Sequence, residues 1–179
     1  MKITTKDIAY TGMFTALIAI GAFIKIPLPG TPLTLQPLFV FLAGMLLGGR
    51  RATLALTAYV LIGLSGIPIF TNGGGIGYIL EPSFGYLLGF IAAAACIGYS
   101  LDKIEHPTFW QYLGIGMIGM VIIYAIGLPY LYLILRLYLG KTLPIKTLLL
   151  TYCLFLLPKD IISCSFAAYF SRYYGKKLK

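Results

Sequence analysis

The sequence predicts an all-α integral membrane protein built from six transmembrane helices. Of its 179 residues, 59% are hydrophobic and 11% are charged, and the mean hydropathy is +0.91. A soluble domain would carry about 25% charged residues. Long apolar runs also recur along the whole chain, separated by short connections rich in proline, glycine or basic residues. This length accommodates about six spans of about 20 residues each, so we expect one transmembrane domain over residues 1–179, without a fused soluble module.

Each apolar run is assigned to one span. The first run is longer than a signal-peptide core and lacks a cleavage site, and three prolines at 27, 29 and 32 end it. The second run is short for a full crossing, so we expect it to begin inside the membrane, with residues 33–36 folded against protein. The third run is expected to continue into a glycine-rich loop. The expected spans are about 8–24, 37–48, 52–66, 83–100, 111–136 and 147–172.

The distribution of basic residues predicts the orientation of the chain. With six spans both termini lie on one side of the membrane, and nine Lys and Arg residues fall on that side against four on the other. This bias predicts cytoplasmic termini in the cell membrane. The net charge of +9 comes from single or short clusters beside apolar runs, so it indicates membrane orientation in a lipid bilayer and no nucleic-acid binding. The counted residues are Lys2, Lys6, Arg50, Arg51, Lys103, Arg172, Lys176, Lys177 and Lys179, against Lys25, Arg136, Lys141 and Lys146.

A glycine-rich loop follows the third run and predicts a ligand site on the outer side. It contains Asn72, Gly73 and Gly74, with further glycines at 75 and 77. Irregular backbone at membrane depth is tolerated where it lines a cavity or is buried in protein. Glycine also lets the backbone approach a ligand closely.

The last span carries two charged residues, Lys159 and Asp160, directly after Pro158. An ionisable residue inside a span costs about 2.5–3.5 kcal/mol on insertion scales, so its presence favours a functional role. Alternatively, the two residues neutralise each other, or Lys159 extends to the membrane surface. Pro158 removes a helical hydrogen bond and is expected to kink the helix.

No catalytic, metal or cofactor site is predicted. Cys96, Cys153 and Cys164 lie inside apolar runs without metal-ligand spacing, where cysteine behaves as a small hydrophobic residue. The single histidine, His106, lies in a short polar connection without a combined carboxylate-and-nucleophile constellation, which favours a solvated loop residue.

Six segments of the chain form a recognisable combination: Thr34-Leu35-Gln36-Pro37, residues 43–48, Gly66-Ile67-Pro68-Ile69-Phe70, the glycines at 73–75, residues 82–90 and Pro158-Lys159-Asp160. Together they resemble the BioY family, the biotin-binding S components of energy-coupling factor (ECF) vitamin transporters. The resemblance covers most of the chain and implies a six-helix ECF S-component-like bundle with biotin held near the outer face. It also implies two kinds of partner, a T component and two ATPase subunits, which drive transport.

The resemblance implies roles for individual residues. Asn72 and Asp160 are assigned to the ureido ring of biotin, because an amide can donate and accept while a carboxylate accepts from N–H groups. Lys159 or Lys25 is a candidate for the valerate carboxylate, although a lysine before the aspartate departs from the family pattern. Gln36 either reaches the ligand or holds loop backbone. The aromatic candidates for the thioether ring are Phe70, Tyr78, Phe84 and, above all, Tyr86.

The first span carries small residues at helical spacing, Gly12, Ala16 and Ala19. Such ridges allow close approach of another helix, and in ECF S components a ridge on this helix docks the coupling protein. Packing within the monomer would use such a ridge equally well. The pairs Gly44/Gly48 and Gly85/Gly89 are assigned to internal packing.

Two other functions stay open from the sequence. One is an S component for another small vitamin, and a ligand other than biotin in the purified protein would reveal it. The other is a membrane-embedded enzyme that uses Asp160 and Lys159 as acid and base, which would require turnover of a bound molecule.

Overall fold

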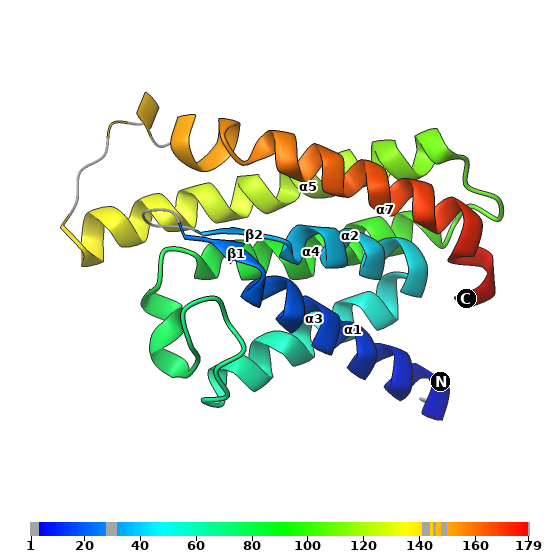
Figure 1. Cartoon of the computed structure of the whole chain (residues 1–179), viewed down its shortest axis with the longest axis horizontal. Helices are drawn as coiled ribbons and strands as arrows, with labels where there is room; N and C mark the ends of the chain where they lie inside the picture. Colours follow the sequence, from blue (N-terminus) through cyan, green and yellow to red (C-terminus); the bar gives the residue numbers. More distant parts are fainter. Residues whose placement is uncertain (1–3, 28–31, 141–143, 145, 148–149, 179) are drawn as a thin grey trace.

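The computed structural model describes residues 4–27, 32–140, 144, 146–147 and 150–178. Lys2, Lys141 and Lys179, which entered the charge count, lie outside these residues. The described part is nearly all helical (Figure 1), which confirms the predicted fold class. Its six long helices are α1 (Thr5–Phe23), α2 (Gln36–Leu47), α3 (Gly49–Leu64), α4 (Phe84–Leu101), α5 (Phe109–Leu133) and α7 (Leu157–Leu178).

Short elements connect these helices at one end of the bundle, which we call the cavity end. They are the antiparallel strands β1 (Lys25–Ile26) and β2 (Leu33–Thr34), the 3₁₀ helix η1 (Ile76–Leu80), and the π-helical turns η2 (Ile134–Tyr138) and η3 (Leu150–Leu154). The beginning of α1 and the end of α7 both lie at the opposite end (Figure 1), as an even number of crossings requires.

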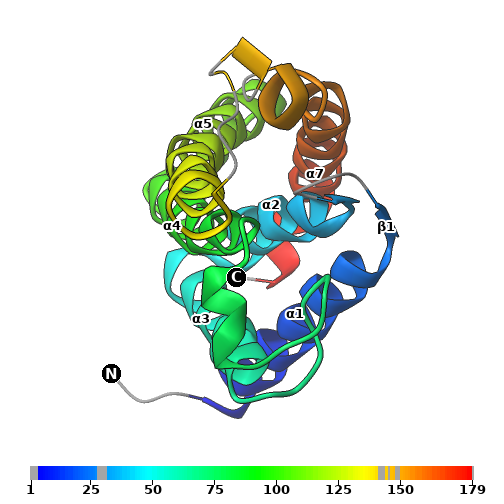
Figure 2. The same cartoon turned by 90° about the vertical axis from the view of Figure 1, so that its left-hand side faces the viewer.

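The short helix α2 lies at the centre of the bundle. In the end-on view it separates α1 and α3 from α4, α5 and α7 (Figure 2), and it contacts all five other long helices. Ten of its 12 residues are buried. A helix wrapped in protein does not need to match the bilayer thickness, and this explains why 12 residues suffice. Thr34 just before it is also buried, as expected for a segment folded against protein.

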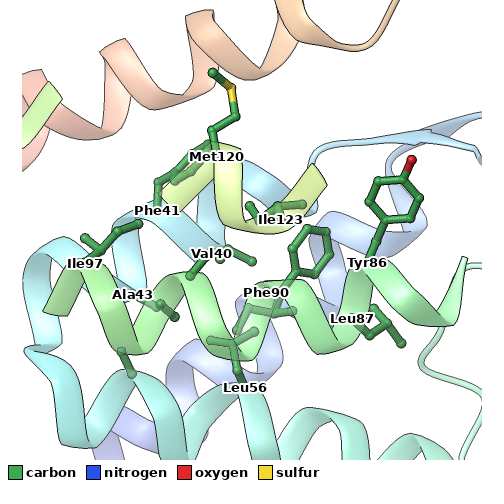
Figure 3. Close-up of a cluster of buried hydrophobic side chains, with 14 of the residues drawn as sticks. Val40, Phe41, Ala43, Leu56, Tyr86, Leu87, Phe90, Ile97, Met120 and Ile123 are labelled. Atoms are coloured by element: carbon green, nitrogen blue, oxygen red, sulfur yellow. The ribbon is translucent and has the colours of Figure 1, made fainter. Parts of the chain in front are cut away.

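All six long helices contribute buried apolar side chains to the core, and Figure 3 shows a part of it that includes side chains of α2, α3, α4 and α5. Leu56, Phe90 and Ile97 are buried, with exposed fractions of at most 5%. Glycines permit close contacts between these helices: a Cβ at Gly44 would lie 2.9 Å from Ile97, and one at Gly89 would lie 2.9 Å from the Ile123 carbonyl oxygen. The sequence-based assignment of these glycines to internal packing is confirmed.

Among the described residues, three helical segments are long and apolar enough to cross a bilayer: Phe84–Leu101, Phe109–Tyr138 and Tyr152–Gly175. Two boundaries differ from expectation. Helix α3 ends at Leu64 and does not continue into the glycine-rich loop. The last span is interrupted, because η3 ends at Leu154 and α7 begins at Leu157. Pro158 therefore lies in the first turn of α7, where a missing backbone N–H costs nothing.

Candidate functional site

A cavity lies at the cavity end of the bundle, between α2, α4, α5 and the beginning of α7. Its volume is about 40 Å³, which is room for a few water molecules. Most of its wall surface is apolar, although eight of the 14 lining residues carry a polar group, and such a combination is usual in small-molecule sites. The lining residues are Pro32, Thr34, Gln36, Pro37, Thr71, Ser83, Tyr86, Leu87, Phe90, Ile123, Tyr124, Leu156, Lys159 and Asp160.

Asp160 is the acidic residue in the described part of this lining. It lies in the first turn of α7, where the helix dipole favours a negative charge, and it is 5% exposed. Its Oδ2 accepts a hydrogen bond of 2.5 Å from the Tyr124 hydroxyl on α5. Its Oδ1 lies 2.5 Å from Lys159 Nζ. The carboxylate is therefore buried between a phenol and an ammonium group.

The contact between Lys159 and Asp160 is an ion pair without hydrogen-bond geometry. Within the described part of the chain, Asp160 Oδ1 has no hydrogen-bond donor, although it is buried. A carboxylate oxygen can accept more than one hydrogen bond. The cavity thus presents a charged acceptor that is paired electrostatically with Lys159 but accepts no hydrogen bond at Oδ1 within the described part of the chain.

Lys159 also connects α7 to the strand before α2. Its Nζ donates a hydrogen bond of 2.8 Å to the carbonyl oxygen of Thr34 in β2. The side chain therefore faces the cavity wall, with 21% of its surface exposed, and does not extend toward the membrane surface. Lys159 and Asp160 therefore form an ion pair, and both residues line the cavity.

Tyr86 and Gln36 both line the cavity, as the sequence predicted for ligand-binding residues. The Tyr86 ring meets the Tyr124 ring edge-on, with centroids 6.1 Å apart, and its hydroxyl donates to the Tyr152 carbonyl oxygen at 3.1 Å. Gln36 Nε2 donates to the Tyr59 hydroxyl at 3.0 Å. The Gln36 amide therefore also supports the structure around the cavity.

The glycine-rich loop contributes a different residue from the one predicted. Thr71 lines the cavity, whereas Asn72 is exposed and lies outside the lining. The structure therefore does not bring Asn72 beside Asp160. Phe70 is 1% exposed and packs against Tyr59 and Tyr78, with ring centroids at 5.4 and 4.5 Å. It belongs to the core beneath the loop and is not part of the cavity wall.

Gly73 and Gly74 shape this loop. Gly73 has a φ of +117°, a conformation open to glycine, and its backbone pairs with that of Phe70. A Cβ on Gly74 would lie 2.3 Å from the Ile67 carbonyl oxygen, so the backbones approach too closely for any other residue. Lys25 Nζ donates to the Thr71 carbonyl oxygen, which ties the hairpin to the loop.

Tyr124, Thr34, Thr71 and Ser83 line the cavity but were not found by sequence reasoning. Tyr124 is one of 14 tyrosines and lies in the middle of a long apolar helix, where nothing in the local pattern marks it. Its α7 partner is 36 residues away. Thr71 adjoins a residue that was predicted, so the glycine-rich loop was the available signal.

A second hollow lies on the outside of the bundle, between α1 and α3. Gly12, Ala16 and Ala19 all line it, together with Leu54 and Ala58 from α3. Gly12 and Ala16 are exposed, and a Cβ at Gly12 would meet nothing within 4 Å. The small residues of α1 therefore face outward rather than into the bundle. We call this hollow the α1–α3 groove.

Comparisons with known proteins agree with this architecture. Over 137 residues the chain is 53% identical to a probable biotin transporter BioY of Lysinibacillus sphaericus, covering 76% of this chain and 70% of that protein. It is 46% identical over 123 residues to the biotin transporter BioY of Thermotoga maritima, covering 68% of this chain and 72% of that protein.

The fold also matches a solved structure. A crystal structure of the S-component for biotin from an ECF-type ABC transporter superposes with a TM-score of 0.84 at 26% sequence identity, over 98% of this chain and 95% of that chain. The family model described as the BioY family matches residues 1–179. The chain belongs to the BioY family.

Proposed function

We propose that the protein is the substrate-capture (S component) subunit of an ATP-driven ECF importer and that it binds biotin. The observation that carries this proposal is the buried Asp160 carboxylate in a mostly apolar cavity, with Oδ1 available to accept a hydrogen bond. The ureido ring of biotin offers two N–H donors of the required kind. Membership of a family of membrane transporters supports a role in transport rather than catalysis.

The lining residues provide a partner for each part of the ligand. Asp160 accepts from the ureido N–H groups, and the rings of Tyr86 and Phe90 pack against the thioether ring. Lys159, an ammonium group in the lining, is the partner for the valerate carboxylate. Because this carboxylate is at the opposite end of biotin from the ureido ring, Lys159 Nζ has to move away from Asp160 Oδ1, which lies 2.5 Å from it in the structure. Gln36 donates from the floor of the site. The lining side chains separate to admit biotin, because a volume of about 40 Å³ is smaller than the molecule.

The glycine-rich loop covers this site. Gly73 and Gly74 contribute backbone close to the ligand, and Phe70 supports the loop from beneath. For Asn72 to bind the ureido ring, its side chain has to turn inward from the exposed position next to Thr71. Lys25, which donates a hydrogen bond to the Thr71 carbonyl oxygen, is the second candidate partner for the valerate carboxylate of biotin.

Partner binding is assigned to the α1–α3 groove. Gly12, Ala16 and Ala19 leave space for a helix of the T component, and their outward exposure supports docking over internal packing. The T component and two ATPases supply the energy for transport. In the cell membrane, the terminal end of the bundle faces the cytoplasm and the cavity end faces outward, consistent with the distribution of basic residues.

Titration of the purified protein with biotin tests the proposal. The protein is freed of bound small molecules by denaturing and refolding or by exhaustive washing in detergent, and binding is followed by calorimetry. We expect tight binding by the parent and loss by at least about 100-fold in Asp160→Ala, because the change leaves ligand N–H groups unpaired in an apolar site.

Ser163→Ala is the matched control, since Ser163 is buried one turn further along α7 and lies outside the cavity lining. It should bind like the parent. Absence of biotin binding by the parent, or release of a different small molecule from it in mass spectrometry, contradicts the proposal.

A further inference from the structure

Tyr124 joins two elements at the cavity. It lies in the middle of α5 and is 7% exposed, and its hydroxyl donates to Asp160 Oδ2 at the beginning of α7 over 2.5 Å. Bonds of 2.5–2.7 Å between a hydroxyl and a carboxylate belong to the strong, charge-assisted class. The Tyr124 ring is in turn held edge-on by Tyr86, with an interplanar angle of 90°.

This bond determines which carboxylate oxygen serves a ligand. Oδ2 is occupied by Tyr124, whereas Oδ1 forms an ion pair with Lys159 but has no hydrogen-bond donor among the described residues. Once Lys159 pairs with the tail of biotin, the Tyr124 hydroxyl is the remaining partner of the carboxylate among the described contacts. Without this hydroxyl, the carboxylate can rotate about its terminal bond, a broad and roughly two-fold torsion. The hydroxyl therefore fixes the orientation of the acceptor that is offered to the cavity.

The ring of Tyr124 has a separate role from its hydroxyl. Besides the cavity, it lines an apolar hollow along α5, with Met120, Ala125, Leu128 and Cys153 among the neighbouring wall residues. The ring thus forms part of the wall between these two spaces. Replacement by phenylalanine keeps this wall and removes only the donor.

We propose that Tyr124 is a positioning residue for biotin recognition: its hydroxyl orients Asp160 so that Oδ1 accepts an N–H of the ureido ring. This inference rests on the proposed biotin binding. In this role Tyr124 acts through Asp160 and does not itself bond to the ureido group. Removal of its hydroxyl should therefore weaken the binding only of ligands that carry the N–H facing Asp160.

Binding of biotin and of two cyclic carbamate analogues by Tyr124→Phe tests the inference. In each analogue an oxygen atom replaces one ureido N–H. For biotin we expect Tyr124→Phe to weaken binding by about 10-fold, in the range for a hydrogen bond to a charged group. For the analogue that lacks the N–H facing Asp160, the same substitution should change binding by less than about 3-fold.

Tyr112→Phe serves as the control, because Tyr112 is also buried on α5 but lies outside the cavity lining. It should bind all three ligands like the parent. Unchanged biotin binding by Tyr124→Phe overturns the inference. An equal loss for all three ligands also overturns it, since that is the result of a general structural role.

If Tyr124→Phe does not fold, 4-aminophenylalanine at position 124 provides the same test with a weaker donor. We expect a smaller loss for biotin that again disappears with the analogue, and a loss shared by all ligands would contradict the inference. Failure of the parent to bind biotin refutes the proposed function itself. Tight parent binding that depends on Asp160 but not on the Tyr124 hydroxyl refutes only the positioning role.

Discussion

Gly74 is a position where one added methyl group should disturb the loop over the cavity. Its Cβ would lie 2.3 Å from the Ile67 carbonyl oxygen and 3.0 Å from that of Gly63, and backbone atoms cannot move aside as a flexible side chain can. We expect Gly74→Ala to lower the free energy of unfolding by about 1–3 kcal/mol, measured by thermal unfolding in detergent. Gly77→Ala, where a Cβ meets nothing within 4 Å, should stay within about 0.5 kcal/mol of the parent; equal effects would exclude the steric cause.

Lys159 makes two contacts within the protein, to Asp160 and to the Thr34 carbonyl oxygen. The effect of its substitution on tail binding is therefore measured by comparing two ligands that differ in the charge of the tail. We expect Lys159→Gln to weaken binding of biotin by about 10-fold more than binding of biotin amide, because the amide has no tail carboxylate to lose an ion pair. Competition binding with the two ligands measures this difference. Lys25→Gln is the comparison, since Lys25 lies outside the lining. If Lys25→Gln discriminates between the ligands and Lys159→Gln does not, the tail assignment belongs to Lys25.

Helix α1 lines the α1–α3 groove with Gly12, Ala16 and Ala19 in its middle and with Ile8 nearer its beginning. We expect Ala16→Trp to fill the groove and to reduce assembly with the T component and ATPases by at least about 10-fold, while biotin binding by the isolated protein stays unchanged. Met13→Trp is a suitable control, because Met13 is 46% exposed and does not line the groove. Assembly that is equally good in both variants would rule out the groove as the docking site.

The beginning of α3 depends on the side chain of Asp102, the residue that follows the end of α4. No side chain of α3 itself or of its N-cap, Gly48, caps this helix; instead Asp102 Oδ2 accepts a hydrogen bond of 2.8 Å from the Gly49 backbone N–H. We expect Asp102→Ala to destabilise the protein by about 1 kcal/mol, as for loss of an N-cap, measured by thermal unfolding. Glu105→Ala in the same exposed connection should leave stability unchanged, and a similar loss there would indicate a general charge effect.

For the molecule as a whole, the helix count and the paths of most spans follow from the sequence. Prolines, glycines and charges interrupt the apolar runs clearly, so α1, α2, α4 and α5 lie close to their predicted positions. The interruption before α7 was not predicted in full: Pro158 suggested a kink, whereas the helix restarts at Leu157.

The site was predictable where charge or backbone chemistry marked it. Asp160 and Lys159 stand out because charges are rare in apolar runs, and both line the cavity. Tyr124 carries no such mark, since its role arises from a contact across 36 residues of sequence. Within the glycine-rich loop, the turn at Gly73 decides which neighbour faces inward, and sequence alone does not distinguish Thr71 from Asn72.

The orientation of the whole molecule is testable with single cysteines in a variant without Cys96, Cys153 and Cys164. With six crossings and the basic residues at the terminal end, we expect a membrane-impermeant maleimide added to intact cells to label Ile76→Cys in η1 but not Lys6→Cys in α1. Ile76 is 72% exposed, so access does not limit its labelling. The reverse pattern would place the cavity end in the cytoplasm.

The central claim is that the cavity around Asp160 captures biotin, and a crystal structure of the protein with biotin bound tests it most directly. We expect the ureido ring in this cavity, with one N–H about 3 Å from Asp160 Oδ1 while the Tyr124 hydroxyl stays on Oδ2. Biotin located elsewhere, with Asp160 still contacting Lys159 and Tyr124 alone, would contradict the account.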